Sequence, residues 1–343
     1  MTDPFRRQLI KALPAALGAA LLAPSAHADS HRLRFATLIP RGSLYHRALL
    51  EVGEAWRHAE GGDPQFTVFT DGVQGDEADI VRRMRIGQLS GAMISVVGLS
   101  EIDPGTTALQ FMPLMFRSWE EVDAAGRELR PLLERRMAER GFVVLYWGEA
   151  GWVRFFSTTP AVRPGDFKRL KLFAWSGSPA QVDLMRALGY QPVVLETADI
   201  LPGLETGLID AVPLIPTWAL ASQVDTLAPH MLEMRWVPIV GAAVMTRAAW
   251  DGVSPAGQAA LRQASVKAGQ DLRAARESQD RGAIEAMEKR GLRIHALNPE
   301  AEAEWRALAA ATYPRIRGGM VPADVFDTVE KALADFRAGH PSA

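Results

Sequence analysis

Short apolar segments of strand type alternate with amphipathic segments of helix type along most of this 343-residue chain, and this alternation restricts the fold most strongly. Strand-like runs occupy residues 32–39, 65–70, 91–98 and 141–150. The pattern restarts at residue 151, and its later strand-like runs include 169–175, 191–195 and 235–246. Such alternation predicts an α/β fold in which mainly parallel sheets are covered by helices.

Two windows rich in strand-forming residues, around Ala150 and Val240, indicate that the chain crosses between two lobes. We expect lobe I to comprise residues 29–153 and 241–253, and lobe II to comprise residues 154–240. Because a ligand site commonly forms where two domains meet, the junction between these lobes is the first place to look for function.

The C-terminal third carries a helical pattern that is longer than one small domain. Ser254 provides an N-cap and Pro255 a first-turn proline, and periodic Ala, Leu and Met residues then continue to Gly291. At about 1.5 Å per residue, such a helix reaches roughly 50 Å. We therefore expect residues 254–343 to form a long helix and a C-terminal segment that brace both lobes. A homodimer through the same helix is an open alternative.

The first 28 residues have the composition of a signal peptide. Basic residues that include Arg6 and Arg7 precede an apolar Ala/Leu stretch, and Ala26-His27-Ala28 follows it as a small-residue cleavage site. We predict cleavage after Ala28 and a periplasmic mature protein. The twin arginines resemble a Tat signal, and a Sec signal or an uncleaved anchor are the alternatives.

The composition excludes several classes of chemistry. The chain has no cysteine, which rules out disulfides, thiolate metal sites and a cysteine nucleophile. A net charge of -2 without long charged blocks gives no support for a nucleic-acid partner. Phosphate-binding glycine loops and a Gly-x-Ser-x-Gly motif are absent. The histidines show no metal-ligand spacing, so we expect no metal, no cofactor and no enzymatic activity.

Aromatic residues and one arginine point to ligand binding at the lobe junction. The aromatic residues near the predicted strand ends and turns are Trp147, Trp152, Phe155, Phe156, Phe173, Trp175, Trp218 and Trp236. Each of them alone fits core packing, but together they favour a cleft. Arg154 stands inside the strand-like run "GWVRFFS", where it would hold either a ligand carboxylate or a structural salt bridge.

Several motifs in order resemble the DctP-type solute receptors of TRAP transporters, the tripartite ATP-independent periplasmic importers. They are a Gly-x-x-Gly turn leading into a helix (72–80), "MPLMFRSWEE" (112–121), "GDFKRLKLF" (165–173), "LETGLIDA" (204–211) and "AAWDGVSPAGQAAL" (248–261). The resemblance implies a two-lobe periplasmic-binding-protein fold with hinge-crossing strands and a long C-terminal bracing helix. It also implies closure around one small ligand, commonly an organic acid, and delivery to small and large TRAP membrane subunits.

The resemblance also implies a departure at the ligand site. Typical members carry an arginine that clamps the substrate carboxylate at the position of Phe173, and a second ligand arginine at the position of Arg154. Replacing the first guanidinium by a phenyl ring removes a charge-assisted contact and adds apolar surface. We therefore expect a ligand with more apolar or aromatic area than a C4-dicarboxylate, held by Arg154 or by backbone donors if it is an acid.

These arguments give a set of candidate ligand contacts. The set comprises Arg154, Phe173, Trp175, Ser176, Gly177, Ser178 and Trp218 from lobe II, and Ser43, Tyr45 and Gln74 from lobe I. Two other classes of function stay open. One is a sensory or scavenging protein without a transporter, and the other is a periplasmic enzyme, for which the sequence offers no convincing titratable pair.

Overall fold

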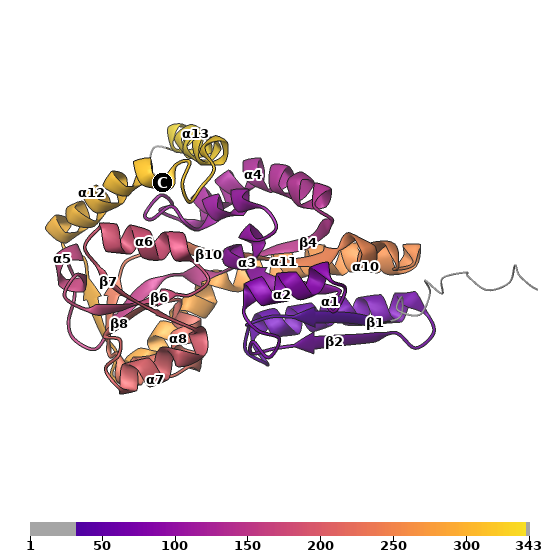
Figure 1. The fold of residues 1–343 in the computed structure, drawn as a ribbon, viewed down its shortest axis with the longest axis horizontal. Helices are drawn as coiled ribbons and strands as arrows, with labels where there is room; N and C mark the ends of the chain where they lie inside the picture. The colour runs from indigo at the N-terminus through magenta and orange to yellow at the C-terminus, as the bar shows by residue number, and fades with distance from the viewer. Residues whose placement is uncertain (1–31, 341–343) are drawn as a thin grey trace, which may run out of the picture.

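The computed structural model describes residues 32–340, so the predicted signal peptide and its cleavage site lie outside the described residues. The chain forms two mixed sheets that lie side by side along the long axis of the molecule (Figure 1). The first sheet has the strand order β2-β1-β3-β10-β4. Its strands are β1 (Arg32–Ala36), β2 (Gln65–Phe69), β3 (Gly91–Ser95), β4 (Phe142–Trp152) and β10 (Pro238–Thr246).

The second sheet has the strand order β11-β9-β5-β8-β6-β7. Its strands are β5 (Arg154–Ser157), β6 (Lys171–Trp175), β7 (Gln191–Leu195), β8 (Ala211–Leu214), β9 (His230–Glu233) and β11 (Arg293–Ala296). The pairs β6–β7, β6–β8 and β9–β11 are parallel, whereas β5 is antiparallel to both β8 and β9.

The chain crosses between the sheets at the two windows that the sequence indicates. Val153 alone separates β4 of the first sheet from β5 of the second, and residues 234–237 lead back from β9 to β10. The two crossings are hydrogen-bonded to each other, since the Val153 amide donates to the Val237 carbonyl (2.9 Å) and the Trp236 amide to the Val153 carbonyl (3.1 Å). The hinge-crossing strands are thereby confirmed.

Helices cover both sheets. The helices before the long one are α1 (Leu44–Glu60), α2 (Glu77–Arg85), α3 (Val96–Ser100), η2 (Pro104–Leu109), α4 (Trp119–Glu139), α5 (Pro164–Phe167), α6 (Pro179–Ala187), η3 (Thr197–Asp199), α7 (Ile200–Glu205), α8 (Pro216–Ala221), α9 (Val224–Leu227) and α10 (Arg247–Asp251). Ser and Asp side chains at Ser43, Asp76 and Ser118 accept backbone hydrogen bonds and so fix the starts of α1, α2 and α4. No helix of the described chain has both the length and the apolarity needed to cross a bilayer.

The long helix α11 (Pro255–Glu288) braces both sheets, as predicted (Figure 1). Ser254 caps it through the Gly257 amide (3.0 Å). Its buried residues recur every three or four positions, so one face of the helix packs along the protein. Leu272 belongs to the core on one side of the first sheet, and Met287 belongs to a core of the second sheet. Helices α12 (Pro299–Ile316) and α13 (Ala323–Gly339) complete the chain.

Three details differ from the sequence expectation. The strand expected over 91–98 ends at Ser95, because the Ser95 hydroxyl caps the short helix α3. The sheets are mixed rather than mainly parallel, since β10 runs antiparallel to both of its neighbours. The C-terminal segment also supplies β11 to the second sheet, a four-residue strand too short to stand out in the sequence.

Candidate ligand-binding site

A cavity of about 740 Å³ lies between the two sheets, and we call it the central cavity. Its walls come from both sheets, from the two crossings and from α11 and α12. The carboxyl ends of parallel strands open into it, because Leu38 and Ile39 follow β1, Ser95 ends β3 and Trp175 ends β6. Ligands bind at such strand ends in open α/β sheets.

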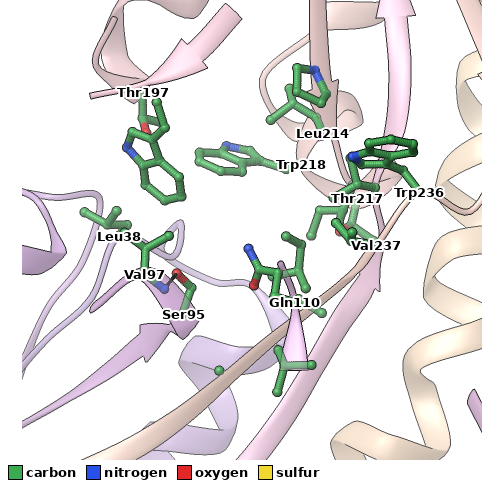
Figure 2. A pocket seen from close by; sticks show the side chains of 18 of the residues that line it. Leu38, Ser95, Val97, Gln110, Thr197, Leu214, Thr217, Trp218, Trp236 and Val237 are labelled. Atoms are coloured by element: carbon green, nitrogen blue, oxygen red, sulfur yellow. Dashed lines mark hydrogen bonds between the residues drawn. The ribbon is translucent and has the colours of Figure 1, made fainter. Parts of the chain in front are cut away.

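The lining of the central cavity is mostly apolar and aromatic. Trp175, Trp218 and Trp236 are only partly buried, and Figure 2 shows Trp218 and Gln110 facing the same space from opposite walls. Phe155 and Phe173 add two buried rings. Among the described lining residues, only Arg41 and Glu77 carry charge. A ligand here meets far more apolar surface than ionic groups.

Glu77 is bound to its own protein rather than free for a ligand. One carboxylate oxygen accepts the Ser95 amide (2.7 Å), and the other accepts the Ser95 hydroxyl (2.6 Å) and the Gly98 amide (2.8 Å). Burial raises the pKa of this carboxyl, and these hydrogen bonds oppose the rise. Glu77 therefore ties α2 to the end of β3 and the start of α3, and it shapes the cavity wall.

Five of the predicted contacts line the central cavity: Ser43, Tyr45, Phe173, Trp175 and Trp218. The Ser43 hydroxyl also accepts the His46 amide (3.2 Å) as the cap of α1. The Tyr45 hydroxyl donates to the Glu149 carbonyl (2.7 Å), which fixes the ring against the hinge strand β4.

The turn at Ser176–Ser178 and the residue Gln74 are not among the lining residues. The Ser176 hydroxyl donates to Glu196 (2.7 Å), and Ser178 precedes α6 without capping it through its side chain. A Cβ atom at Gly177 would lie 3.4 Å from Val97 in α3, so this turn sits against the other sheet's helix. We infer that the turn forms the rim of the central cavity, where the two halves of the molecule approach each other.

Arg154 also lies outside the central cavity, contrary to the expectation that its side chain faces the cleft. Val153 and Phe155 line the central cavity. Because successive side chains of a strand point to opposite faces, the residue between them turns away. Arg154 instead lines a second cavity.

Sequence reasoning missed Gln110, which follows η2 in the segment between α3 and α4. Gln110 is 6% exposed, and its side-chain oxygen has no hydrogen-bond partner among the described residues. A buried amide without a partner is costly unless a ligand or water completes it. Nothing in the sequence indicates that Gln110 lines a cavity, because the residue stands in an apolar run without periodicity.

Comparison with known proteins identifies the family. Residues 35–317 match the sequence profile of the bacterial extracellular solute-binding proteins of family 7, DctP. The chain belongs to the DctP family. Since this is a family of binding proteins, the expectation of a binding protein rather than an enzyme is confirmed. Among residues 32–340, no three His, Cys, Asp or Glu side chains come together as a metal site.

Two curated relatives illustrate the range of the DctP family. The 2,3-diketo-L-gulonate-binding periplasmic protein YiaO of Escherichia coli is 25% identical over 270 residues, which cover 76% of this chain and 80% of the relative. The C4-dicarboxylate-binding periplasmic protein DctP of Rhodobacter capsulatus is 21% identical over 226 residues, covering 65% and 67%.

A solved structure confirms the fold. A TRAP periplasmic solute-binding protein of Ralstonia eutropha, with bound (S)-2-acetolactate, superposes with a TM-score of 0.81 at 20% identity and covers 89% of this chain and 99% of the other. The two-lobe fold predicted from the resemblance is therefore correct.

Proposed function

We propose that this DctP-family protein is the extracytoplasmic solute receptor of a TRAP importer, and that it binds a small organic acid of apolar or aromatic character in the central cavity. The observation that carries the proposal is the lining of that cavity, where three partly buried tryptophans and three phenylalanines accompany a single cation, Arg41. A volume of about 740 Å³ lies within the usual range of small-molecule sites, about 300–1,000 Å³.

The acidic group of the ligand needs donors, and the central cavity offers few. Arg41 stands in the turn after β1, and the Gln110 amide faces the same space. Relatives bind acids, since the YiaO protein binds 2,3-diketo-L-gulonate and the Ralstonia protein holds (S)-2-acetolactate. We propose that Arg41 and Gln110 hold the acidic end, while Trp175, Trp218 and Phe173 cover the apolar part.

The same proposal includes closure of the two lobes around the ligand. Residues 29–153 and 241–253 would form lobe I and residues 154–240 lobe II, with β11 added to lobe II. Two contacts already join the halves: Leu184 of α6 packs against the hydrophobic core that includes Ile94 of β3, and the turn at Gly177 approaches Val97 of α3. A ligand that touches both walls stabilises this approach, and the TRAP membrane subunits would recognise the closed form.

The first experiment is native mass spectrometry of the mature protein, followed by denaturation and identification of any released small molecule. We expect an aromatic or branched aliphatic acid in stoichiometric amount. If the protein is purified empty, a thermal-shift screen of organic acids replaces this step. A screen in which no apolar or aromatic acid raises the melting temperature, while sugar acids do, contradicts the proposed ligand class.

Variants locate the ligand. Trp218→Ala removes a large apolar contact, so we expect affinity for the identified ligand to fall about tenfold to a hundredfold in isothermal titration calorimetry. Arg41→Gln should weaken acids and spare an amide analogue of the same ligand. Ile86→Ala, an exposed change outside the cavity, and Arg127→Gln on the surface of α4 are the matched controls. Equal affinity in Trp218→Ala and in Ile86→Ala would place the ligand elsewhere.

A further inference from the structure

A second cavity, of about 450 Å³, opens beside the crossing that leads from β9 to β10. Its walls come from the loop before α4, the start of β5, the segment after β9, the end of β11 and helix α12. We call it the arginine cavity, because its charged residues are Arg117, Arg154, Arg235, Arg306, Glu233 and Glu302.

Arg154 is the buried charged residue of the arginine cavity. The residue is 6% exposed, and its side chain makes one long hydrogen bond, from Nη1 to the Trp152 carbonyl at 3.4 Å. Its Nε has no partner among the described residues. Burial lowers the pKa of the guanidinium to about 10, so the group is still charged at neutral pH. Asp280 and Glu233 attract this buried cation and partly offset its burial, but neither forms an ion pair with it among the described residues, so its hydrogen-bonding capacity is largely unused.

The other charges of the arginine cavity leave a positive excess. Arg306 and Glu302 pair with each other along α12, at 2.7 and 2.9 Å. Arg235 is exposed, makes one long hydrogen bond from Nη1 to the Arg117 carbonyl at 3.4 Å, and lies over the Trp152 ring at 5.8 Å from its centre. Glu233 is the one remaining carboxylate in the lining against three arginines. The cavity therefore combines a buried guanidinium with two exposed ones and attracts negative charge.

The arginine cavity is distinct from the central cavity. Of the described lining residues, only Trp305 faces both. Its indole nitrogen donates to the Val162 carbonyl (2.8 Å), and its ring stacks on Phe155 at 5.7 Å between ring centres. This buried indole separates the apolar site from the charged one, so a ligand in the central cavity does not complete the bonding of Arg154.

We propose that the arginine cavity is a second binding site, which takes a small multivalent oxyanion on Arg154 and Arg235. Guanidinium groups match the oxygen spacing of sulfate, phosphate and carboxylate, and several donors around one anion favour a multivalent one. A bound oxyanion would contact the start of β5 and the segment after β9, the two crossings between the sheets. The site does not depend on the proposed ligand of the central cavity.

The test uses inorganic phosphate and sulfate as probes for the mature protein, in a buffer whose ionic strength is held constant with chloride. We expect saturable binding in calorimetry and a saturable rise in melting temperature. Acetate at the same concentration should bind at least tenfold more weakly, because it carries one charge. A rise that does not saturate, or that chloride reproduces, overturns the proposal.

Variants assign the anion to the arginine cavity. Arg154→Met removes the buried charge and with it a cation that attracts Asp280, so the comparison is made for each protein with and without phosphate, and this variant should not respond to phosphate. Arg235→Gln should lower phosphate affinity about tenfold. This exposed change also tests the site if Arg154→Met fails to fold. Arg41→Gln, in the central cavity, should leave phosphate affinity unchanged. Phosphate binding that is lost in Arg41→Gln and retained in Arg154→Met and Arg235→Gln would refute the site.

Discussion

Replacing Asp280 by asparagine should make the stability of the protein less dependent on pH. Asp280 of α11 is 7% exposed; one carboxylate oxygen accepts the Trp152 amide of the hinge strand (3.2 Å), and the other has no partner among the described residues. Burial raises the pKa of Asp280 from 3.8 to about 6, although the Trp152 hydrogen bond and the nearby Arg154 and Arg235 lower it.

The direction of the effect follows from this pKa. Because the folded protein holds the Asp280 proton more tightly than the unfolded chain, protonation favours the folded state. The stabilisation is fully present below pH 3.8 and is lost as the pH rises through about 6. Between pH 7.5 and pH 4 the contribution of this one carboxyl changes by about 2.5 kcal/mol.

Asparagine keeps an acceptor for the Trp152 amide and removes the buried charge, but it adds a buried amide donor that costs about 1–2 kcal/mol. We expect Asp280→Asn to be about 1 kcal/mol more stable than the wild type at pH 7.5, and about 1–2 kcal/mol less stable at pH 4. Urea unfolding across this pH range measures the difference.

Asp271→Asn is the matched control, because Asp271 lies on the same helix with a side chain that is 54% exposed. Its difference from the wild type should stay within about 0.5 kcal/mol at every pH. Comparing each variant with the wild type at the same pH cancels the other carboxylates. If the stability difference between Asp280→Asn and the wild type changes as little with pH as that of the control, burial does not perturb the pKa of Asp280 and the reasoning fails.

Three further changes test other parts of the structure by urea unfolding. Glu77→Gln should cost about 2–3 kcal/mol, because an amide cannot accept every hydrogen bond that the carboxylate accepts; an unchanged midpoint would contradict that role. Arg276→Met should cost about 3–5 kcal/mol, since it breaks the ion pair with Asp123 (2.8 Å) and leaves buried Glu149 with Arg130 alone; a neutral result would contradict a stabilising role for this pair. Gly241→Ala places a Cβ atom 2.6 Å from the Ile94 carbonyl oxygen of β3 and should cost about 1–3 kcal/mol, whereas a neutral result would mean that the strands separate freely.

Much of the fold could be predicted because it depends on long periodic patterns. The alternation of strand and helix, the crossings near Ala150 and Val240, and the 34-residue helix α11 all extend over many residues. The elements that the sequence did not predict are short. α3 has five residues inside an apolar run, and its start depends on the Ser95 hydroxyl and on Glu77, which is distant in sequence. No local pattern reports such a contact.

The candidate site was predictable in part, for a geometric reason. The positions of Phe173, Trp175 and Trp218 follow from their places at strand ends or in the returning segment, and all three line the central cavity. Arg154 could not be placed in the same way, because the face of the sheet on which its side chain lies depends on the register of β5 against β8 and β9. Gln110 needed the tertiary structure, which alone shows its oxygen buried without a partner.

The strand orders of the two sheets also determine when each sheet can be completed during folding. β10 lies between β3 and β4, yet it is synthesised after most of the second sheet, and β11 joins β9 only after α11 has been made. Neither sheet is a contiguous segment that can form alone, and the pairings close long loops of chain. The protein should therefore unfold as one cooperative unit, and no cut in either crossing would release an independently folded half.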